Sequence, residues 1–294
     1  MIDKRYTHDY DRIFGDSSRA RNALVIHDPT GSYNYFNPWW HPYYRRGDLH
    51  SLQSVTKTIT SVVIGAAVQR GEFPSIDTPV LTFFDTTQVK AIDANKRRLT
   101  IRHLLTMTGG FDWNENLPYI DPNNTAIQLE GSYDWVRFTI DRPMEEQPPG
   151  TRFNYNSGET VLLAHIFRQA TGIDIEEYAA RHLFVRGGSW NGQPVVSSDW
   201  VRASTAPAIR LGTSPTSASY GFKWWLYPDP TDSTRTVWAG SGFGGQLPYA
   251  FPELDLVVVF NGWSILPGQP SIPQRKTMER LARAVQGPLP SPRR

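Results

Sequence analysis

The strongest constraint on how this chain folds is its apolar segment at residues 54–70, which reads Ser-Val-Thr-Lys-Thr-Ile-Thr-Ser-Val-Val-Ile-Gly-Ala-Ala-Val-Gln-Arg. Apolar side chains recur through it at helical spacing, at Val55, Ile59, Val62, Val63 and Ala66. Gly71 follows directly and is a typical helix stop. A helix that is apolar on most of its faces has to be buried. We therefore expect a central helix around which the other elements pack.

The segments on either side of this helix differ in character. Residues 22–26 have the pattern of a short strand, and residues 73–149 carry short helical patterns broken by Pro and Gly. A second amphipathic helix is expected at about 157–170, with residues 175–183 continuing helically. Four β-rich segments joined by short turns then predict an antiparallel meander: residues 220–227, 234–239, 247–251 and 254–261.

Composition excludes several classes of function. The 294 residues are 39% apolar and carry a formal charge of +2 without a long basic run, so we expect a sizeable core and no nucleic-acid partner. The absence of cysteine removes disulfides, thiolate metal sites and cysteine nucleophiles. No stretch approaches the roughly 18 apolar residues of a membrane span, and the first residues lack the apolar core of a signal peptide. We expect a soluble chain; its compartment and oligomeric state are not specified by the sequence.

The first chemical motif is Ser54-Val55-Thr56-Lys57, at the start of the central helix. A separation of three residues puts both side chains on one helical face, about 5–6 Å apart at Cβ, so the lysine amine can reach the serine hydroxyl. A serine needs such help to act as a nucleophile, and the helix amino terminus favours a developing oxyanion. The alternative is that Ser54 only caps the helix and Lys57 is solvated.

Two further motifs lie later in the chain. Residues 150–159 form a turn that leads into a helix and presents Tyr155, which would act as a phenolate-type base if a nearby lysine ammonium lowered its pKa. Residues 240–246, Gly-Ser-Gly-Phe-Gly-Gly-Gln, let the backbone approach a ligand closely and offer an amide for an oxyanion hole. The alternatives are that the tyrosine only packs against its neighbours and that the glycines only form a hairpin turn.

Taken together and in this order, the three motifs resemble those of the serine β-lactamase and penicillin-binding-protein superfamily, which are Ser-x-x-Lys, Tyr-x-Asn and a Lys-Thr-Gly-like strand motif. The surrounding segments 51–61, 99–110, 149–158 and 244–260 are similar to the class C β-lactamase branch, which includes family VIII esterases and nylon-oligomer hydrolases. The resemblance extends from about residue 22 to residue 265.

The resemblance implies an α/β lobe, an antiparallel sheet flanked by helices and built from residues 1–71 and 197–294, with a mainly helical lobe inserted at 72–196. It implies acyl transfer in which Ser54 attacks an ester or amide carbonyl while Lys57 and Tyr155 move its proton, with no metal and no cofactor. The amides of Ser54 and Phe243 would form the oxyanion hole. Ser157 and Gly242 would contact the substrate.

The chain departs from the pattern in three places. Tyr155-Asn156-Ser157 stands where class C β-lactamases have Tyr-Ser-Asn, so a hydroxyl replaces the amide that helps to hold a β-lactam side chain. Gly240-Ser241-Gly242, or Trp238-Ala239-Gly240 in another register, contains no lysine. Relatives also have several dozen residues after the equivalent of Phe184, where this chain continues directly into Val185-Arg186-Gly187. This shortening predicts an open cleft and a slow, permissive enzyme, unless Trp190 and the aromatic cluster at 220–225 close it.

Other chemistries find little support. No His-Glu-x-x-His pattern, Gly-x-Ser-x-Gly elbow or phosphate-binding Gly-Lys-Ser motif occurs. His103, on a helix that Thr100 can cap, is expected to pack or cap rather than to bind metal. The expected function is a carboxylesterase or amidase. A D-Ala-D-Ala-type peptidase or weak β-lactamase, and a catalytically silent binding protein, are the alternatives.

Overall fold

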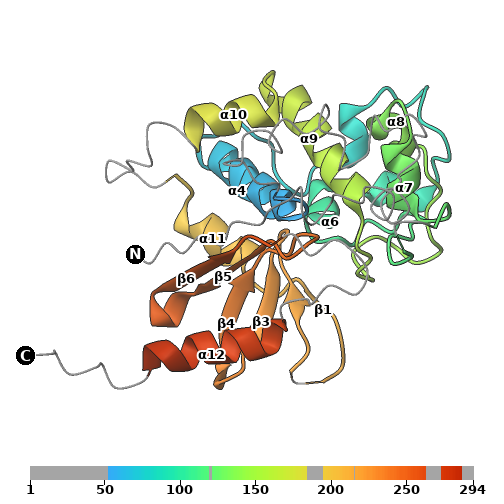
Figure 1. Ribbon diagram of the computed structural model, residues 1–294. Helices are drawn as coiled ribbons and strands as arrows, with labels where there is room; N and C mark the ends of the chain where they lie inside the picture. Colours follow the sequence, from blue (N-terminus) through green and yellow to red (C-terminus); the bar gives the residue numbers. More distant parts are fainter. Residues whose placement is uncertain (1–51, 119–120, 184–194, 215, 263–272, 287–294) are drawn as a thin grey trace, which may run out of the picture.

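The computed structural model describes residues 52–118, 121–183, 195–214, 216–262 and 273–286, and places helices on one side of the molecule and a sheet on the other (Figure 1). The expected strand at 22–26 lies outside the described residues. The combination of an antiparallel sheet with packed helices confirms the α/β fold class. The division into lobes at residues 72 and 196 stays a prediction.

The helical side is built on two long helices, α4 (Val55–Gln69) and α9 (Ser157–Thr171). Both agree within one residue with the expected ranges 54–70 and about 157–170. Helix α9 ends before Gly172, whose φ of 74° is the left-handed conformation that glycine adopts most easily. Around them lie shorter elements: η1 (Val80–Phe83), α5 (Ala94–Arg98), α6 (Ile101–Leu105), α7 (Thr125–Glu130), α8 (Trp135–Ile140), α10 (Ile175–His182) and α11 (Ser198–Ser204).

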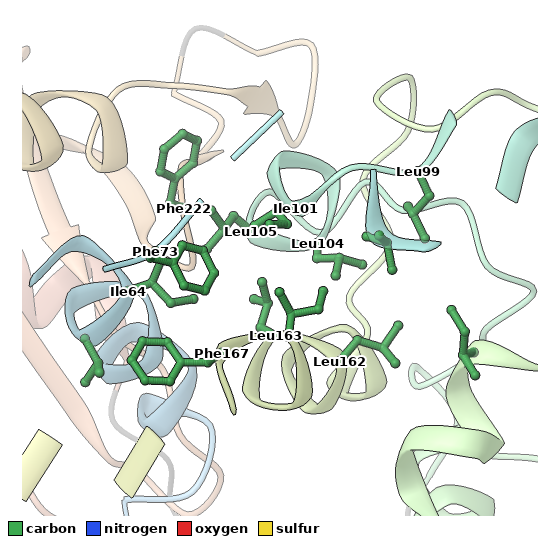
Figure 2. Close-up of a cluster of buried hydrophobic side chains, with 14 of the residues drawn as sticks. Ile64, Phe73, Leu99, Ile101, Leu104, Leu105, Leu162, Leu163, Phe167 and Phe222 are labelled. Carbon is green, nitrogen blue, oxygen red and sulfur yellow. The ribbon is translucent and has the colours of Figure 1, made fainter. Parts of the chain in front are cut away.

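The core of this side is a cluster of fully buried side chains shown in Figure 2. Ile64 of α4 and Leu163 of α9 contribute to it, and so does Phe222, which lies in the turn between two strands. A fully buried leucine or isoleucine contributes about 1.5–3 kcal/mol relative to an exposed one. Phe222 therefore anchors the turn between β2 and β3 in the core of the helical side.

Helix α4 also packs against α11, with the Trp200 side chain of α11 lying directly on the α4 backbone at Gly65. A Cβ atom added at Gly65 would lie 2.2 Å from Cδ1 of Trp200, far inside van der Waals contact. Trp200 is 6% exposed and packs against Phe222 in a tilted arrangement, with ring centroids 5.5 Å apart. Glycine is therefore needed at position 65 for the indole ring to reach the helix backbone.

Among the described residues the sheet is a six-stranded antiparallel meander in the order β1 to β6. The β-rich segments predict the meander, but a turn divides the expected segment 220–227 between β2 and β3, and β1 was not expected. Its strands and associated helices are β1 (Ile209–Arg210), β2 (Ser219–Tyr220), β3 (Trp225–Asp229), β4 (Asp232–Ala239), β5 (Leu247–Phe251), η3 (Pro252–Leu254), β6 (Leu256–Phe260) and α12 (Gln274–Gln286). Met278 and Ala282 of α12 pack onto a second buried cluster formed by β4 and β5, and Figure 1 shows this helix across one face of the sheet.

Candidate active site

Ser54 and Lys57 occupy the amino-terminal turn of α4. Ser54 is the residue before the helix and its side chain makes no capping hydrogen bond, so the capping alternative is not what the structure shows. Lys57 Nζ donates to Ser54 Oγ across 2.9 Å. Among the described residues, the Ser54 backbone N–H has no hydrogen-bond acceptor, which leaves it at the positive end of the helix dipole.

Lys57 is buried rather than solvated, with 9% of its surface exposed. Burial lowers the pKa of its amine, because an apolar environment disfavours the charged form, and the carboxylates of Glu115 and Glu130 oppose this shift. The amine is thus closer to its neutral form at physiological pH than an exposed lysine would be. A neutral amine 2.9 Å from a hydroxyl is placed to accept its proton.

Tyr155 faces the same two side chains from the loop before α9. Lys57 Nζ lies 5.0 Å from the centre of the tyrosine ring, and the phenol is hydrogen-bonded to Ser54. Its neighbours fix the backbone: Asn154 N–H donates to Met107 O at 2.9 Å, and Asn156 Oδ1 caps α9 by accepting from Glu159 N–H at 3.1 Å. The structure therefore brings all three residues together.

Burial raises the pKa of Tyr155 well above its usual value, and the hydrogen bond from Ser54 only partly opposes this shift. The direction is opposite to the one that a phenolate base requires. This corrects the expectation from the sequence: the tyrosine is a neutral phenol that can donate and accept a hydrogen bond, and Lys57 is the better proton acceptor. The cause is desolvation, which a sequence motif does not reveal.

Glu115 is a polar residue of the site that sequence reasoning missed. It is 7% exposed and accepts three hydrogen bonds, from Trp113 Nε1 at 3.0 Å and from the backbone and hydroxyl of Ser157 at 2.8 and 2.6 Å. The hydroxyl of Ser157, expected to contact substrate, is thus already donated to a carboxylate. Burial and the nearby Glu115 raise the pKa of a second missed acid, Glu130, to about 7.

The glycine-rich turn at 240–246 packs beside the start of α4. A Cβ atom at Gly242 would lie 2.6 Å from Leu52 O, and one at Gly240 would touch Val55 at 3.4 Å. The glycines therefore permit a close approach to the two residues that flank Ser54 on either side. Phe243, whose amide is a candidate for the oxyanion hole, belongs to this turn and is 37% exposed.

Aromatic rings line the other side of Tyr155. Trp225, the first residue of β3, stacks on it with ring centroids 6.1 Å apart and an interplanar angle of 27°. Phe153 and Tyr220 pack against the same indole at 6.0 and 5.2 Å. Part of the aromatic cluster at 220–225 thus lies against a site residue, while Trp190 and the junction after Phe184 lie outside the described residues.

A family model described as Beta-lactamase matches residues 35–207, which is more than half of the chain. The chain belongs to the Beta-lactamase family. This confirms the resemblance drawn from the three motifs. A curated relative, the 6-aminohexanoate-dimer hydrolase of Paenarthrobacter ureafaciens, is 25% identical over 276 residues, covering 74% of this chain and 68% of the relative.

Solved structures share the fold of this Beta-lactamase family member. The octameric penicillin-binding protein homologue from Pyrococcus abyssi superimposes with a TM-score of 0.56 at 17% identity, over 81% of this chain and 65% of the homologue, which is slightly less than two thirds of its length. EstCE1, a hydrolase with promiscuous acyltransferase activity, superimposes with a TM-score of 0.59 at 12% identity, over 80% of this chain and 84% of the other. The relatives named as hydrolases agree with the expectation of an enzyme.

Within the described ranges, no group of three or more His, Asp or Glu side chains is placed to hold a metal ion, and no helix there is both long and apolar enough to cross a membrane. His103 acts as a cap, because its Nδ1 accepts from Thr100 N–H at 3.1 Å, as the sequence predicts.

Proposed function

We propose that this chain is a serine hydrolase that cleaves small esters or amides through an acyl-enzyme formed on Ser54. The observation that carries the proposal is the 2.9 Å contact between a buried lysine amine and the Ser54 hydroxyl at a helix amino terminus. Hydroxyl, base and helix dipole are the parts that nucleophilic catalysis needs.

In the proposed reaction Ser54 Oγ attacks the substrate carbonyl while its proton passes to the neutral amine of Lys57. The carbonyl oxygen becomes an oxyanion held by the amides of Ser54 and Phe243, and the amino end of α4 stabilises its charge. Tyr155 relays the proton to the departing alcohol or amine. Water then attacks the acyl group and gives its proton to Lys57, which returns a proton to Ser54 Oγ as the acyl–oxygen bond breaks and the acid leaves.

The comparisons support ester and amide substrates. The curated relative is named for hydrolysis of a 6-aminohexanoate dimer, whose two units are joined by an amide, and EstCE1 is described as a hydrolase that also transfers acyl groups. Gly240-Ser241-Gly242 lacks the lysine of the Lys-Thr-Gly motif, so strong β-lactamase activity is not part of the proposal.

Mass spectrometry of the intact protein, after incubation with a fluorophosphonate and separately with a penicillin, tests the proposal directly. We expect one fluorophosphonate adduct on the peptide that contains Ser54, and a burst of product from a chromogenic acetate or butyrate ester. A stable penicillin adduct with nitrocefin turnover would favour the peptidase or β-lactamase alternative. A folded protein that takes up neither probe would leave only the binding-protein alternative.

A further inference from the structure

Glu115 is a buried carboxylate that holds the first residue of α9 by both of its oxygens. Its Oε2 accepts from the backbone N–H of Ser157 at 2.8 Å, and its Oε1 accepts from the Ser157 hydroxyl at 2.6 Å. The first N–H groups of a helix have no acceptor within it, and negative charge is favoured at that end. Hydrogen bonds to a carboxylate are also roughly twice as strong as neutral ones. Glu115 therefore fixes the start of α9 from outside the helix.

The same carboxylate orients a ring that packs on this helical turn. Glu115 Oε2 also accepts from Trp113 Nε1 at 3.0 Å. A Cβ atom added at Gly158, the second residue of α9, would lie 2.9 Å from Cη2 of Trp113, so the indole lies directly on the helix backbone. Glu115, which is 7% exposed, thus acts on the first turn of α9 both directly and through the indole.

Tyr155 lies between hydrogen bonds that tie its neighbours to an earlier segment of the chain. Asn154 N–H donates to Met107 O at 2.9 Å, and Asn154 Nδ2 donates to Trp113 O at 2.8 Å. On the other side, Asn156 N–H donates to Met107 Sδ at 3.3 Å. The backbone of Tyr155 makes no hydrogen bond to the backbone of any other described residue. The position of the phenol therefore depends on how its neighbours are held.

We propose that Glu115 is a positioning residue, which acts through Ser157 to hold the Tyr155 phenol at the nucleophile. This inference rests on the proposed function of Ser54. Ser157 is two residues from Tyr155, so a shift of the first helical turn reaches the phenol along a short piece of backbone. The phenol is hydrogen-bonded to Ser54, and a misplacement of about 1 Å at a reacting group can lower a rate by about 100-fold.

Two other roles would give different results. Glu115 favours the charged form of the Lys57 amine, so a substitution at Glu115 changes the charge of the site as well as its geometry. The sequence also predicts that the Ser157 hydroxyl contacts substrate. Ser157→Ala separates these effects from positioning, because it removes the 2.6 Å hydrogen bond and leaves the Glu115 charge and the Ser157 N–H in place.

The test is stopped-flow acylation by a chromogenic acetate ester, which gives the acylation rate constant and the substrate affinity separately. It is measured for the wild type, Ser157→Ala, Tyr155→Phe and the double variant. We expect Ser157→Ala to lower the acylation rate constant about tenfold, with little change in affinity and an unmoved pH profile. In the Tyr155→Phe background the same substitution should have less than about a twofold effect, because the phenol that it misplaces is gone.

Thr171→Ala is the matched control. It removes a hydroxyl donor from the other end of α9, where Thr171 Oγ1 donates to Phe167 O at 2.8 Å, and its acylation rate constant should stay close to the wild type. Three results for folded Ser157→Ala would overturn the inference: an unchanged rate constant, an equal loss with and without the Tyr155 phenol, or a loss confined to substrate affinity.

Glu115→Gln decides the question if Ser157→Ala does not fold. It is measured on the alkaline plateau, where Lys57 is neutral with or without the carboxylate, so only the geometric effect remains. An amide cannot accept with both of its ends, so the plateau rate constant should fall about tenfold, and this loss should again disappear in the Tyr155→Phe background. A plateau at the wild-type level would contradict the positioning role.

A measurement without substrate separates this inference from the proposed function. With ring-¹³C tyrosine, the NMR resonance of Tyr155 is assigned by its absence from Tyr155→Phe. Ser157→Ala should shift this resonance and Thr171→Ala should not; an unmoved resonance in Ser157→Ala would overturn the inference whatever the activity. Acylation that is absent from the wild type, or that persists in Ser54→Ala, would instead overturn the proposed function.

Discussion

Lys57 Nζ and Ser54 Oγ lie 2.9 Å apart within one turn of the same helix. Because Ser54 is the N-cap of α4 and Lys57 lies in its first turn, their contact does not depend on how α4 packs against other elements. Tyr155, which comes from the loop before α9, depends on the packing of α9 against α4. The nucleophile and its base therefore form a local unit, and the third residue is added by the tertiary fold.

Replacing Ser54 by alanine should lower ester hydrolysis by at least about 10³-fold, because the covalent route is lost. The fold should survive, since the Ser54 side chain makes no capping hydrogen bond. Ser61→Ala is a matched control on the same helix: its hydroxyl is buried with no partner among the described residues, so both activity and unfolding midpoint should stay close to the wild type. An active, folded Ser54→Ala protein would refute the assignment.

Lys57→Ala, Tyr155→Phe and the double variant should lose similar activity, because residues that act as a unit do not multiply their losses. The shared hydrogen-bonded contact with Ser54 is the physical basis. The rate of hydrolysis of a chromogenic ester is measured for the wild type, both single variants and the double variant, and circular dichroism checks that each is folded. Strictly multiplicative losses would mean that the two residues serve separate steps.

The pH profile of kcat/KM should rise towards mildly alkaline values. Protonated Lys57 cannot accept the Ser54 proton, so activity is lost as the pH falls through the pKa of Lys57, which burial lowers from its ordinary 10.5. The Glu115 carboxylate raises that pKa, so Glu115→Gln should move the limb to lower pH. A profile that is flat from pH 5 to 9 would exclude the proton-transfer role.

Lys96→Met should reduce the free energy of unfolding by about 3 kcal/mol, because removing a buried donor leaves acceptors unsatisfied. Lys96 is fully buried and donates to Lys90 O, Ile140 O and Arg142 O at 2.9, 2.8 and 2.7 Å. Urea denaturation measures the loss. The exposed Arg97 of the same helix provides the control, since Arg97→Met should change stability by less than about 0.5 kcal/mol.

Acyl-chain selectivity distinguishes an open site from a shaped one. The shortened chain after Phe184 predicts less than a 100-fold spread of kcat/KM across acetate, butyrate, octanoate and a bulky aryl ester, or about 2.7 kcal/mol of differential transition-state binding. A larger spread that collapses in Trp225→Ala would show instead that the indole stacked on Tyr155 forms a pocket wall. Trp135→Ala, at an exposed position in α8, is the control.

The central helix, the meander and the family were all predictable, because they depend on patterns that lie close together in the sequence. The apolar repeat of α4 and the stop at Gly172 specify their elements locally. The contact between Ser54 and Lys57 follows from helical spacing alone. These features need no knowledge of the tertiary fold.

Glu115 and Glu130 could not be predicted as parts of the site. Each reaches it through long-range packing, and an acid in the loop after Trp113 or at the end of a short helix has the pattern of a solvated residue. The pKa of Tyr155 was missed for the same reason, since desolvation depends on neighbours such as Trp225 that are distant in sequence.

The contact between Gly65 and Trp200 lies outside the site but influences where Ser54 stands relative to Tyr155. Helix α4 moves nearly as a rigid rod, so a side chain that pushes it away at position 65 also displaces Ser54, eleven positions earlier, relative to Tyr155. Pairing small residues at 65 with smaller rings at 200 would shift the attacking oxygen by fractions of an ångström while every reacting group stays unchanged. Substitutions at positions 65 and 200 therefore offer a way to change reactivity in laboratory evolution without altering a residue that contacts the substrate.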